Sequence, residues 1–202
     1  MFTVTLSPEV VMSKTVKYED LVTRKGLYYR KSSDVPFTGK TTGKTQGTFK
    51  NGKKDGPYVR YHKNGQLFLK TNYKDGKRDG PYIRYYDNGR LSSKGKQKDG
   101  KQEGPHVTYH RNGQLQTKGT FKDGKNEGPY EQYWENGQVM FKGTYKDGKE
   151  EGLGVTYYNN GQLWFKGTYK DGKQEGPWVW YKKDGTVVEK YTGTFKNGVK
   201  VK

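Results

Sequence analysis

The stretch GPYVRYHKNGQLFLKTNYKDGK, residues 56–77, contains two runs rich in aromatic and aliphatic residues, one on each side of Asn64-Gly65. The second run ends at Asp75-Gly76. Short runs of this composition between Asn-Gly and Asp-Gly are typical of β-strands joined by tight turns. Glycines at this density would break a helix. The stretch therefore predicts a unit of strand, turn, strand and turn.

The same unit recurs through the chain with a period of 24 residues. Two series of turn glycines mark it: Gly65, Gly89, Gly113, Gly137, Gly161 and Gly185, and Gly52, Gly76, Gly100, Gly124, Gly148 and Gly172. Fixed self-similarity indicates a repeat array, in which each unit buries its apolar surface against its neighbours. The sequence therefore predicts an all-β fold, an extended antiparallel β-meander of 24-residue hairpin units that forms a single twisted sheet.

The period divides the chain into four segments. Residues 47–185 form an array of six units, residues 14–46 a divergent N-terminal capping segment, and residues 186–202 a C-terminal capping segment. Atypical end units are expected, because the open edges of an array need covering. We interpret residues 1–13 as a flexible leader or as the truncated remnant of an export signal.

The low hydrophobicity of the chain does not indicate disorder. Hydrophobic residues make up 29% and charged residues 30%, and the formal net charge is +18, values that are typical of disordered chains. However, eighteen Tyr, eight Phe and four Trp lie at regular positions of the units, which favours a folded array. The chain has no Cys, which excludes disulfides and Cys-based metal sites or nucleophiles. No apolar run approaches the ~18 residues of a membrane span.

The register of the hairpin predicts which residues share a face. A three-residue loop with Gly65 in the left-handed region pairs Tyr61 with Leu67 and Val59 with Leu69, so that apolar residues oppose each other. The Asp-Gly segment predicts a second turn of the same kind. Odd-numbered residues then share one face of the whole sheet, and even-numbered residues share the other. The odd face carries the apolar columns that begin at Val59 and Tyr61, and it is expected to be the packing face.

The even face carries a column of lysines, Lys70, Lys94, Lys118, Lys142 and Lys166. Because successive units lie ~10 Å apart across two strands, this column would attract a polyanion or an anionic membrane. Lysines on an open sheet also act as gatekeepers against aggregation, and this alternative stays open.

The even face also carries every tryptophan, and these concentrate in the C-terminal half of the chain. With neighbouring large side chains they predict a partner-binding patch formed by Tyr130, Trp134, Met140, Tyr158, Trp164, Trp178 and Trp180. Exposed aromatic residues interleaved with lysine suit an acidic protein surface, and a nucleic acid less well. The alternative is that these rings pack across strands and only stabilise the sheet.

No residue pattern indicates catalysis, a metal site or a cofactor. The histidines are expected to be exposed, and His106 and His110 lie ~13 Å apart along a strand, too far for one metal ion. There is no nucleophile elbow and no phosphate-binding loop. Acids beside the turn glycines suit hydrogen bonds to the turn backbone better than a calcium site: Asp55, Asp79, Glu103, Glu127, Glu151 and Glu175.

Units of the form GPYxxYxxNGQLxxKGTYKDGKxE resemble the MORN-repeat variant found in bacterial proteins of the YwqK type. The segment from Gly26 to Gly39 also resembles the first segment of those proteins, so the resemblance covers nearly all of the chain from Lys14 onward. It implies an antitoxin of a toxin–antitoxin system and supplies no catalytic residues. Eukaryotic relatives with MORN repeats are often scaffolds or associate with anionic lipids, so the resemblance also implies these roles. It also implies export to the periplasm or the medium, with the cytoplasm as the alternative.

We therefore expect a non-enzymatic protein-interaction scaffold that acts by stoichiometric binding to an acidic protein partner. The alternative is a peripheral protein that binds an anionic membrane or another polyanion through the lysine column. The sequence leaves the identity of the partner and the oligomeric state open.

Overall fold

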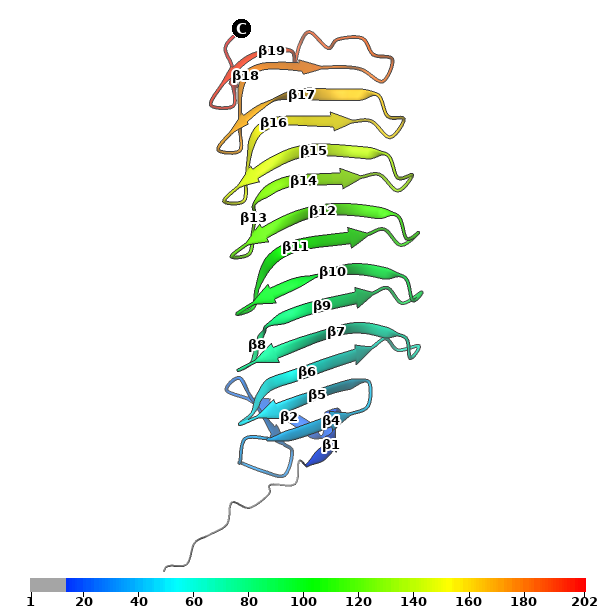
Figure 1. Cartoon of the computed structure of the whole chain (residues 1–202), viewed down its shortest axis with the longest axis vertical. Coiled ribbons are helices and arrows are strands. Elements are labelled where there is room, and N and C mark those ends of the chain that lie inside the picture. Colours follow the sequence, from blue (N-terminus) through cyan, green and yellow to red (C-terminus); the bar gives the residue numbers. More distant parts are fainter. Residues whose placement is uncertain (1–13) are drawn as a thin grey trace, which may run out of the picture.

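The computed structural model describes residues 14–202, so the predicted leader, residues 1–13, lies outside the described residues. Strands dominate the fold (Figure 1), and the described helical structure is one 3-10 turn, η1 (Tyr18–Asp20). The strands are β1 (Thr15–Lys17), β2 (Leu21–Arg24), β3 (Leu27–Arg30), β4 (Gly39–Thr42), β5 (Thr45–Lys50), β6 (Lys53–Tyr61), β7 (Leu67–Lys74), β8 (Lys77–Arg78), β9 (Gly80–Tyr85), β10 (Leu91–Lys98), β11 (Lys101–Tyr109), β12 (Leu115–Lys122), β13 (Lys125–Asn126), β14 (Gly128–Tyr133), β15 (Val139–Lys146), β16 (Lys149–Tyr157), β17 (Leu163–Lys170), β18 (Lys173–Trp180), β19 (Gly193–Lys196) and β20 (Val199–Lys200).

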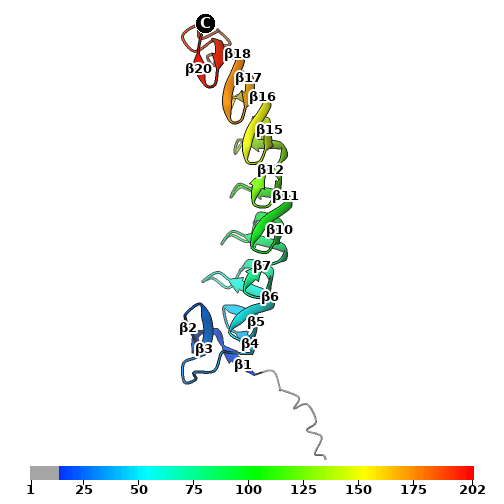
Figure 2. The ribbon, with the colours of Figure 1, turned by 90° about the vertical axis from the view of Figure 1, so that its left-hand side faces the viewer.

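Eighteen of these strands form one sheet, which confirms the predicted meander. From β4 onward the pairings are antiparallel and join successive strands, except at β8–β9 and β13–β14, while β1 pairs parallel with β4 at the N-terminal end. Strands β8 and β9 both pair with β7 and act as one interrupted strand, as β13 and β14 do against β12. The β2–β3 hairpin forms a separate two-stranded sheet beside the first strands of the array (Figure 2).

The first turn of each unit has the predicted form. His62 N–H donates to the Gln66 carbonyl at 2.8 Å, Gly65 has a φ of 86°, and Tyr61 lies opposite Leu67. This is a three-residue loop with glycine in the left-handed region, which no β-branched residue adopts without strain.

The pairing then departs from the prediction, because a β-bulge follows the loop. Arg60 pairs with Leu69 and Val59 pairs with Lys70, which leaves Phe68 as an extra residue, and the expected pair of Val59 with Leu69 is wrong. The same bulge recurs at the matching residues of the later units, Ser92, Gln116, Met140 and Trp164.

The second turn also differs from the prediction, since it is a two-residue turn. Lys74 pairs with Lys77, and both central residues have positive φ, 49° at Asp75 and 85° at Gly76. Asp-Gly is a preferred sequence for this type I′ geometry, whose twist matches the strands that it joins. A bulge combined with an even-length turn shifts the second strand of each hairpin by one position.

The odd-and-even rule for the faces is therefore wrong. One face, here called the lysine face, carries the Lys70 column together with Val59, Ile83, Val107, Glu131, Val155 and Val179 and the Tyr61 column. The opposite face, here called the aromatic face, carries Tyr58, Tyr82, His106, Tyr130 and Trp178, with Leu69, Phe141 and Phe165 and with Tyr73, Phe121, Tyr145 and Tyr169. The valine and lysine columns thus share one face, whereas the prediction placed them on opposite faces.

The core lies on the aromatic face. Phe49, Leu69 and Trp178 are only 1% exposed, and Phe141 is also buried. Rings of neighbouring strands meet edge to face, with centroids 4.7 Å apart between Tyr169 and Trp178. Such pairs add to the stabilisation that burial alone gives.

Glycines on the neighbouring strands make room for these rings. A Cβ atom at Gly167 would lie 2.1 Å from Cδ2 of Trp178, and one at Gly119 would lie 2.6 Å from Cδ2 of Tyr130. Each of these two rings therefore lies against the backbone of a glycine, and this close approach requires Gly119 and Gly167.

We expect Gly167→Ala to lower the free energy of unfolding by ~1–3 kcal/mol, because the new methyl group overlaps an indole that is buried and cannot move aside. Urea denaturation followed by tryptophan fluorescence measures the change. Thr168→Ala, on the exposed side of the same strand, is the control and should shift stability by less than ~0.5 kcal/mol. Equal effects of the two substitutions would contradict the assignment of the faces.

Candidate functional site

Each hairpin turn is bonded to the next by one ring that follows the Tyr61 column. The ring donates to a tyrosine carbonyl in the following unit, at 3.0 Å from His62 Nε2 to Tyr85 and at 3.1 Å from Trp134 Nε1 to Tyr157. Tyr86, His110 and Tyr158 make the same contact at 2.7, 2.9 and 2.8 Å. The residue types differ, but each supplies a ring N–H or O–H at the same place, with the histidines protonated on Nε2. These five residues are here called the ring ladder.

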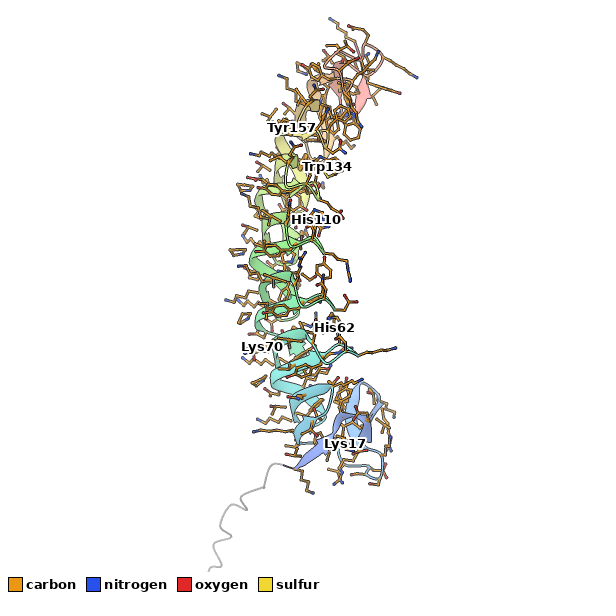
Figure 3. All side chains as sticks on the ribbon, turned by 90° about the vertical axis from the view of Figure 1, so that its right-hand side faces the viewer. Lys17, His62, Lys70, His110, Trp134 and Tyr157 are labelled. Carbon is orange, nitrogen blue, oxygen red and sulfur yellow. The ribbon has the colours of Figure 1, made fainter. Side chains whose placement is uncertain are left out.

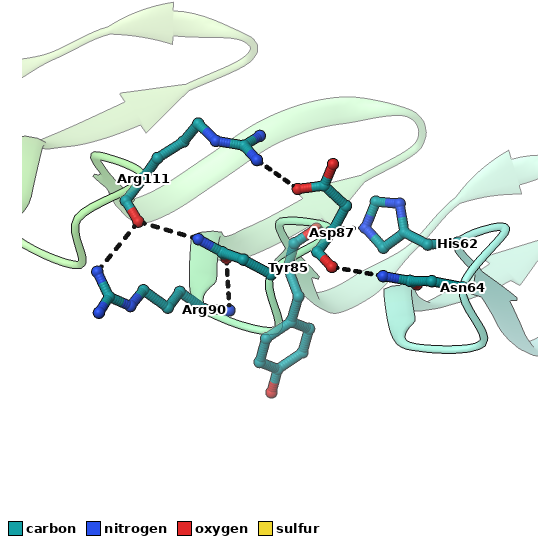
Figure 4. A network of polar contacts seen from close by, with 7 residues as sticks. His62, Asn64, Tyr85, Asp87, Arg90 and Arg111 are labelled. Carbon is teal, nitrogen blue, oxygen red and sulfur yellow. Dashed lines mark hydrogen bonds and ion pairs between the residues drawn. The ribbon is translucent and has the colours of Figure 1, made fainter.

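Asparagine side chains in the three-residue turns add further hydrogen bonds along the edge of the sheet that carries the ring ladder (Figure 4). Asn64 Nδ2 donates to the Asp87 carbonyl at 2.7 Å, while its Oδ1 accepts from Gln66 N–H within the turn at 3.1 Å. Asn88, Asn112 and Asn136 repeat both bonds. Arg111 adds an ion pair to Asp87 at 2.5 Å. The edge that carries the three-residue turns is therefore fixed by side-chain bonds from unit to unit.

Acids fix the opposite edge, and the predicted bond to a turn backbone is made by five of the six acids, whereas Asp55 makes no such bond among the described residues. The carboxylate of Glu127 accepts from Asp147 N–H in the next Asp-Gly turn at 2.9 Å. Asp79, Glu103, Glu151 and Glu175 do the same for the turns that follow them, at 2.9–3.2 Å. These carboxylates bond to the turn backbone, and within residues 14–202 no group of three or more His, Asp or Glu side chains is placed to hold a metal ion.

Asn112→Ala should lower the free energy of unfolding by about 1–2 kcal/mol, because it removes one bond within the turn and one to the Glu135 carbonyl. Asn160→Ala is a matched control, since among the described residues Asn160 makes only the bond within its turn. Its effect should be about half as large. Equal losses in urea denaturation would show that the bond between units contributes nothing.

The bulged residues lie over the ring ladder. Phe68 contacts His62 edge to face with centroids 4.9 Å apart, and Trp164 stacks on Tyr158 at 5.3 Å. Figure 3 shows His62, His110 and Trp134 on one side of the ribbon and Lys70 on the other. The ring ladder and the bulged residues together are here called the hairpin edge.

A pocket of about 670 Å³ opens at the middle of the hairpin edge. Its walls come from two successive ladder rings, two bulged residues and the aromatic face between them: His110, Gln116, Thr117, Gln132, Trp134 and Met140. This combination of apolar walls and convergent amide groups suits a side chain of a partner protein.

The predicted partner-binding patch is divided between two places. Trp134, Met140, Tyr158 and Trp164 belong to the hairpin edge, where Trp164 is 38% exposed. Tyr130, Trp178 and Trp180 instead lie on the aromatic face. The expectation that the tryptophans share a face with the lysines is wrong, because the bulge moves Lys166 to the opposite side from Trp178 and Trp180.

Trp178 is not a surface residue. Its side chain is 1% exposed, its Nε1 donates to the Thr168 carbonyl at 3.1 Å, and it stacks on Trp180 at 5.2 Å. Across to β17, Trp178 contacts Tyr169 and Trp180 contacts Phe165, with centroids 4.7 and 5.8 Å apart, so the alternative of cross-strand packing describes these two tryptophans, whereas Trp164 stays accessible.

The lysine column is exposed along its whole length, but one position is paired. Lys118 Nζ lies 3.1 Å from Glu131, which also accepts a hydrogen bond from Tyr133. Burial alone would raise the pKa of Glu131, but the bonds from Tyr133 and Lys118 hold this pKa below its ordinary value. Glu131 therefore interrupts the positive charge at the middle of the array. Near Lys70 and Lys94, a pocket of about 470 Å³ lies between Pro57 and Pro105.

Positive charge and tryptophan residues separate along the array. Residues 54–101 carry thirteen Lys and Arg against five Asp and Glu, whereas residues 126–173 carry six against seven. Every arginine precedes residue 112, and every tryptophan follows residue 133. The sequence contains this signal, although reasoning from the lysine column alone missed it, because that column continues evenly through both halves.

The histidines are half-buried, which corrects the expectation that they are exposed. His106 lies on the aromatic face, where burial and then the charge of Arg84 lower its pKa. His62 and His110 belong to the ring ladder. Among the described residues no helix is long and apolar enough to cross a membrane.

Comparison with known protein families gives five tandem matches to the MORN repeat variant, at residues 54–75, 78–99, 102–123, 126–147 and 150–171. The chain belongs to this family. The MORN repeat also matches at residues 46–57, at the start of the array, and at residues 191–201, within the C-terminal segment. MORN repeats are generally protein- or membrane-interaction repeats, and this repeat fold is typically non-catalytic. No curated protein matches the chain.

Proposed function

We propose that this MORN-repeat protein is a non-enzymatic scaffold that binds a protein partner at the hairpin edge. It acts by stoichiometric association, as the antitoxin of a toxin–antitoxin system does. The observation that carries the proposal is the open pocket between Trp134 and Met140, one unit away from the exposed Trp164. Tryptophan is over-represented among the residues that dominate binding energies.

The rigidity of the hairpin edge supports this choice of surface. Trp134 and Tyr158 are each held by a hydrogen bond to the following unit, and Trp164 is held by stacking on Tyr158. A preorganised surface loses little conformational entropy when a partner binds, which favours affinity. The antitoxin role itself rests on the resemblance of the units to YwqK-type proteins, and binding alone is sufficient for such a role.

A second candidate is the binding of a polyanion or an anionic membrane by the lysine face. The observation that favours it is the excess of eight positive charges in residues 54–101, thirteen basic against five acidic side chains. Lys70 and Lys94 form no ion pair among the described residues, whereas Lys118 is paired with Glu131. Such binding would therefore take place mainly in the N-terminal half, and it would weaken steeply with salt.

An affinity pull-down with the full-length chain, followed by titration of the recovered protein, tests the first candidate. We expect Trp164→Ala to weaken binding about tenfold or more, because the ring is exposed at the hairpin edge. Leu153→Ala is the control, since Leu153 is 62% exposed but lies on the lysine face. It should change the dissociation constant by less than about twofold.

The outcome that contradicts this proposal is a partner whose affinity is unchanged by Trp164→Ala in a protein with wild-type melting. If the affinity instead falls on Lys70→Ala/Lys94→Ala and with rising salt, the second candidate takes its place. Neither substitution removes a bond of the ring ladder, so the array should stay folded in both variants.

A further inference from the structure

The repeat places an equivalent of the edge pocket 48 residues earlier in the chain. Its positions are His62, Phe68, Leu69, Arg84, Tyr86 and Ser92, which replace His110, Gln116, Thr117, Gln132, Trp134 and Met140. The backbone pairing is the same at both places, since Leu69 pairs with Arg84 as Thr117 pairs with Gln132. The chemistry differs, because an amide is replaced by a guanidinium group and a second amide by a phenyl ring.

Two arginines approach the Phe68 ring at this earlier equivalent of the edge pocket. Cζ of Arg60 lies 5.4 Å and Cζ of Arg84 lies 5.7 Å from the centroid of Phe68. Leu69, on the strand between them, pairs with both arginines and is 1% exposed. Cation–π contact and the buried leucine therefore hold the two side chains in fixed positions.

Neither of these arginines has an acidic partner among the described residues, and in this they resemble Arg30, Arg78 and Arg90. Arg24 and Arg111 form ion pairs with Asp34 and Asp87, but Arg60 and Arg84 form none among the described residues. Nε of Arg84 is buried and makes no hydrogen bond to any described residue. Because Nε is buried, a ligand reaches Arg84 only at the terminal nitrogens of the guanidinium group, which are not among the buried atoms that lack a partner.

We propose that Arg60, Phe68 and Arg84 form a carboxylate clamp that binds an acidic segment of the protein partner. The proposal rests on the proposed scaffold function, and it places a second contact two units away from the edge pocket. The planar fork of a guanidinium group matches the two oxygens of a carboxylate. The partner supplies the acceptors that the chain itself does not place beside these arginines.

The location of the clamp favours an acidic protein segment over a membrane or a nucleic acid. Arg84 is on the aromatic face and Phe68 on the hairpin edge, the side that also carries Trp134 and Trp164, so one partner reaches both contacts. A polyanion attracted by the overall charge would instead meet the lysine face, where Lys70 and Lys94 are exposed.

Titration of the full-length chain with an N-acetylated, C-amidated hexaglutamate peptide tests the clamp. We expect Arg60→Gln/Arg84→Gln to weaken binding by about tenfold or more. Arg90→Gln/Arg111→Gln removes the same two charges from the hairpin turns, and Lys70→Gln/Lys94→Gln removes them from the lysine face. Both controls should change the dissociation constant by less than about twofold.

Equal losses in all three double variants would overturn the clamp, since they indicate only a diffuse positive field. A direct measurement covers the case in which the clamp variant is unstable. In the wild-type protein the peptide should shift the Arg84 Nε–H resonance and leave that of Arg111 in place. An unshifted Arg84 resonance at saturating peptide contradicts the proposal.

Two further ligands test the class of the partner. A hexathymidylate oligonucleotide and phosphatidylserine vesicles should bind, if at all, with equal affinity to the wild type and to the clamp variant. Clamp-dependent binding of either ligand, tighter than that of the peptide, would overturn the assignment to an acidic protein segment. If the affinity of a recovered partner falls on substitution of Trp164 but not on substitution of Arg84, the clamp proposal is wrong and the scaffold proposal is unaffected.

Discussion

A one-residue bulge, which follows the three-residue turn in five successive units, decides what each face of the sheet presents. In the first unit the bulge at Phe68 places Val59 beside Lys70 and places Leu69 beside Arg60. Without it, the Val59, Tyr61 and Leu69 columns would share one face, and the lysines would share the other face with the Tyr58 column. With it, the aromatic rings face glycines and form the core, while the lysine face mixes aliphatic and charged columns. The bulged side chains also make the hairpin edge, so the candidate site exists because of the same irregularity.

The second constraint is that a single-layer sheet has no opposing layer to bury its core. Rings lying against glycine, such as Trp178 on Gly167, replace the missing layer on the aromatic face. At the two edges the units are joined by side-chain bonds to backbone groups, His62 to the Tyr85 carbonyl and Glu127 to Asp147 N–H. Because each unit contacts mainly its neighbours, stability is close to a sum of unit and interface contributions. A change at one ring or one cap should therefore act locally.

Much of the fold can be predicted from the sequence, because period and turn chemistry are local. The left-handed glycine of the first turn and the backbone bonds of Glu103 and its equivalents follow from residue type alone. The faces cannot be predicted in the same way, since a bulge has no sequence signature here: Phe68, Ser92 and Trp164 share only their position. One shifted residue then reverses every assignment on the following strand. The ring ladder could not be predicted for a related reason, because His62 and Trp134 share only a hydrogen-bond donor on a ring. The separation of charge, in contrast, was readable from the sequence.

Repetition gives this array a set of geometrically equivalent niches along one edge, and the side chains at those niches differ. Near Arg84 the niche presents cations without acidic partners, and near Trp134 it presents apolar walls and amides. The two niches lie two units apart, roughly 20 Å at ~4.8 Å per strand. A partner that uses both must therefore be extended along the edge, with its acidic part toward the N-terminal units and its apolar part toward the C-terminal units. The direction in which such a partner binds follows from this asymmetry, because the reversed orientation would place carboxylates beside Trp164 and leave the guanidinium of Arg84 without an acceptor.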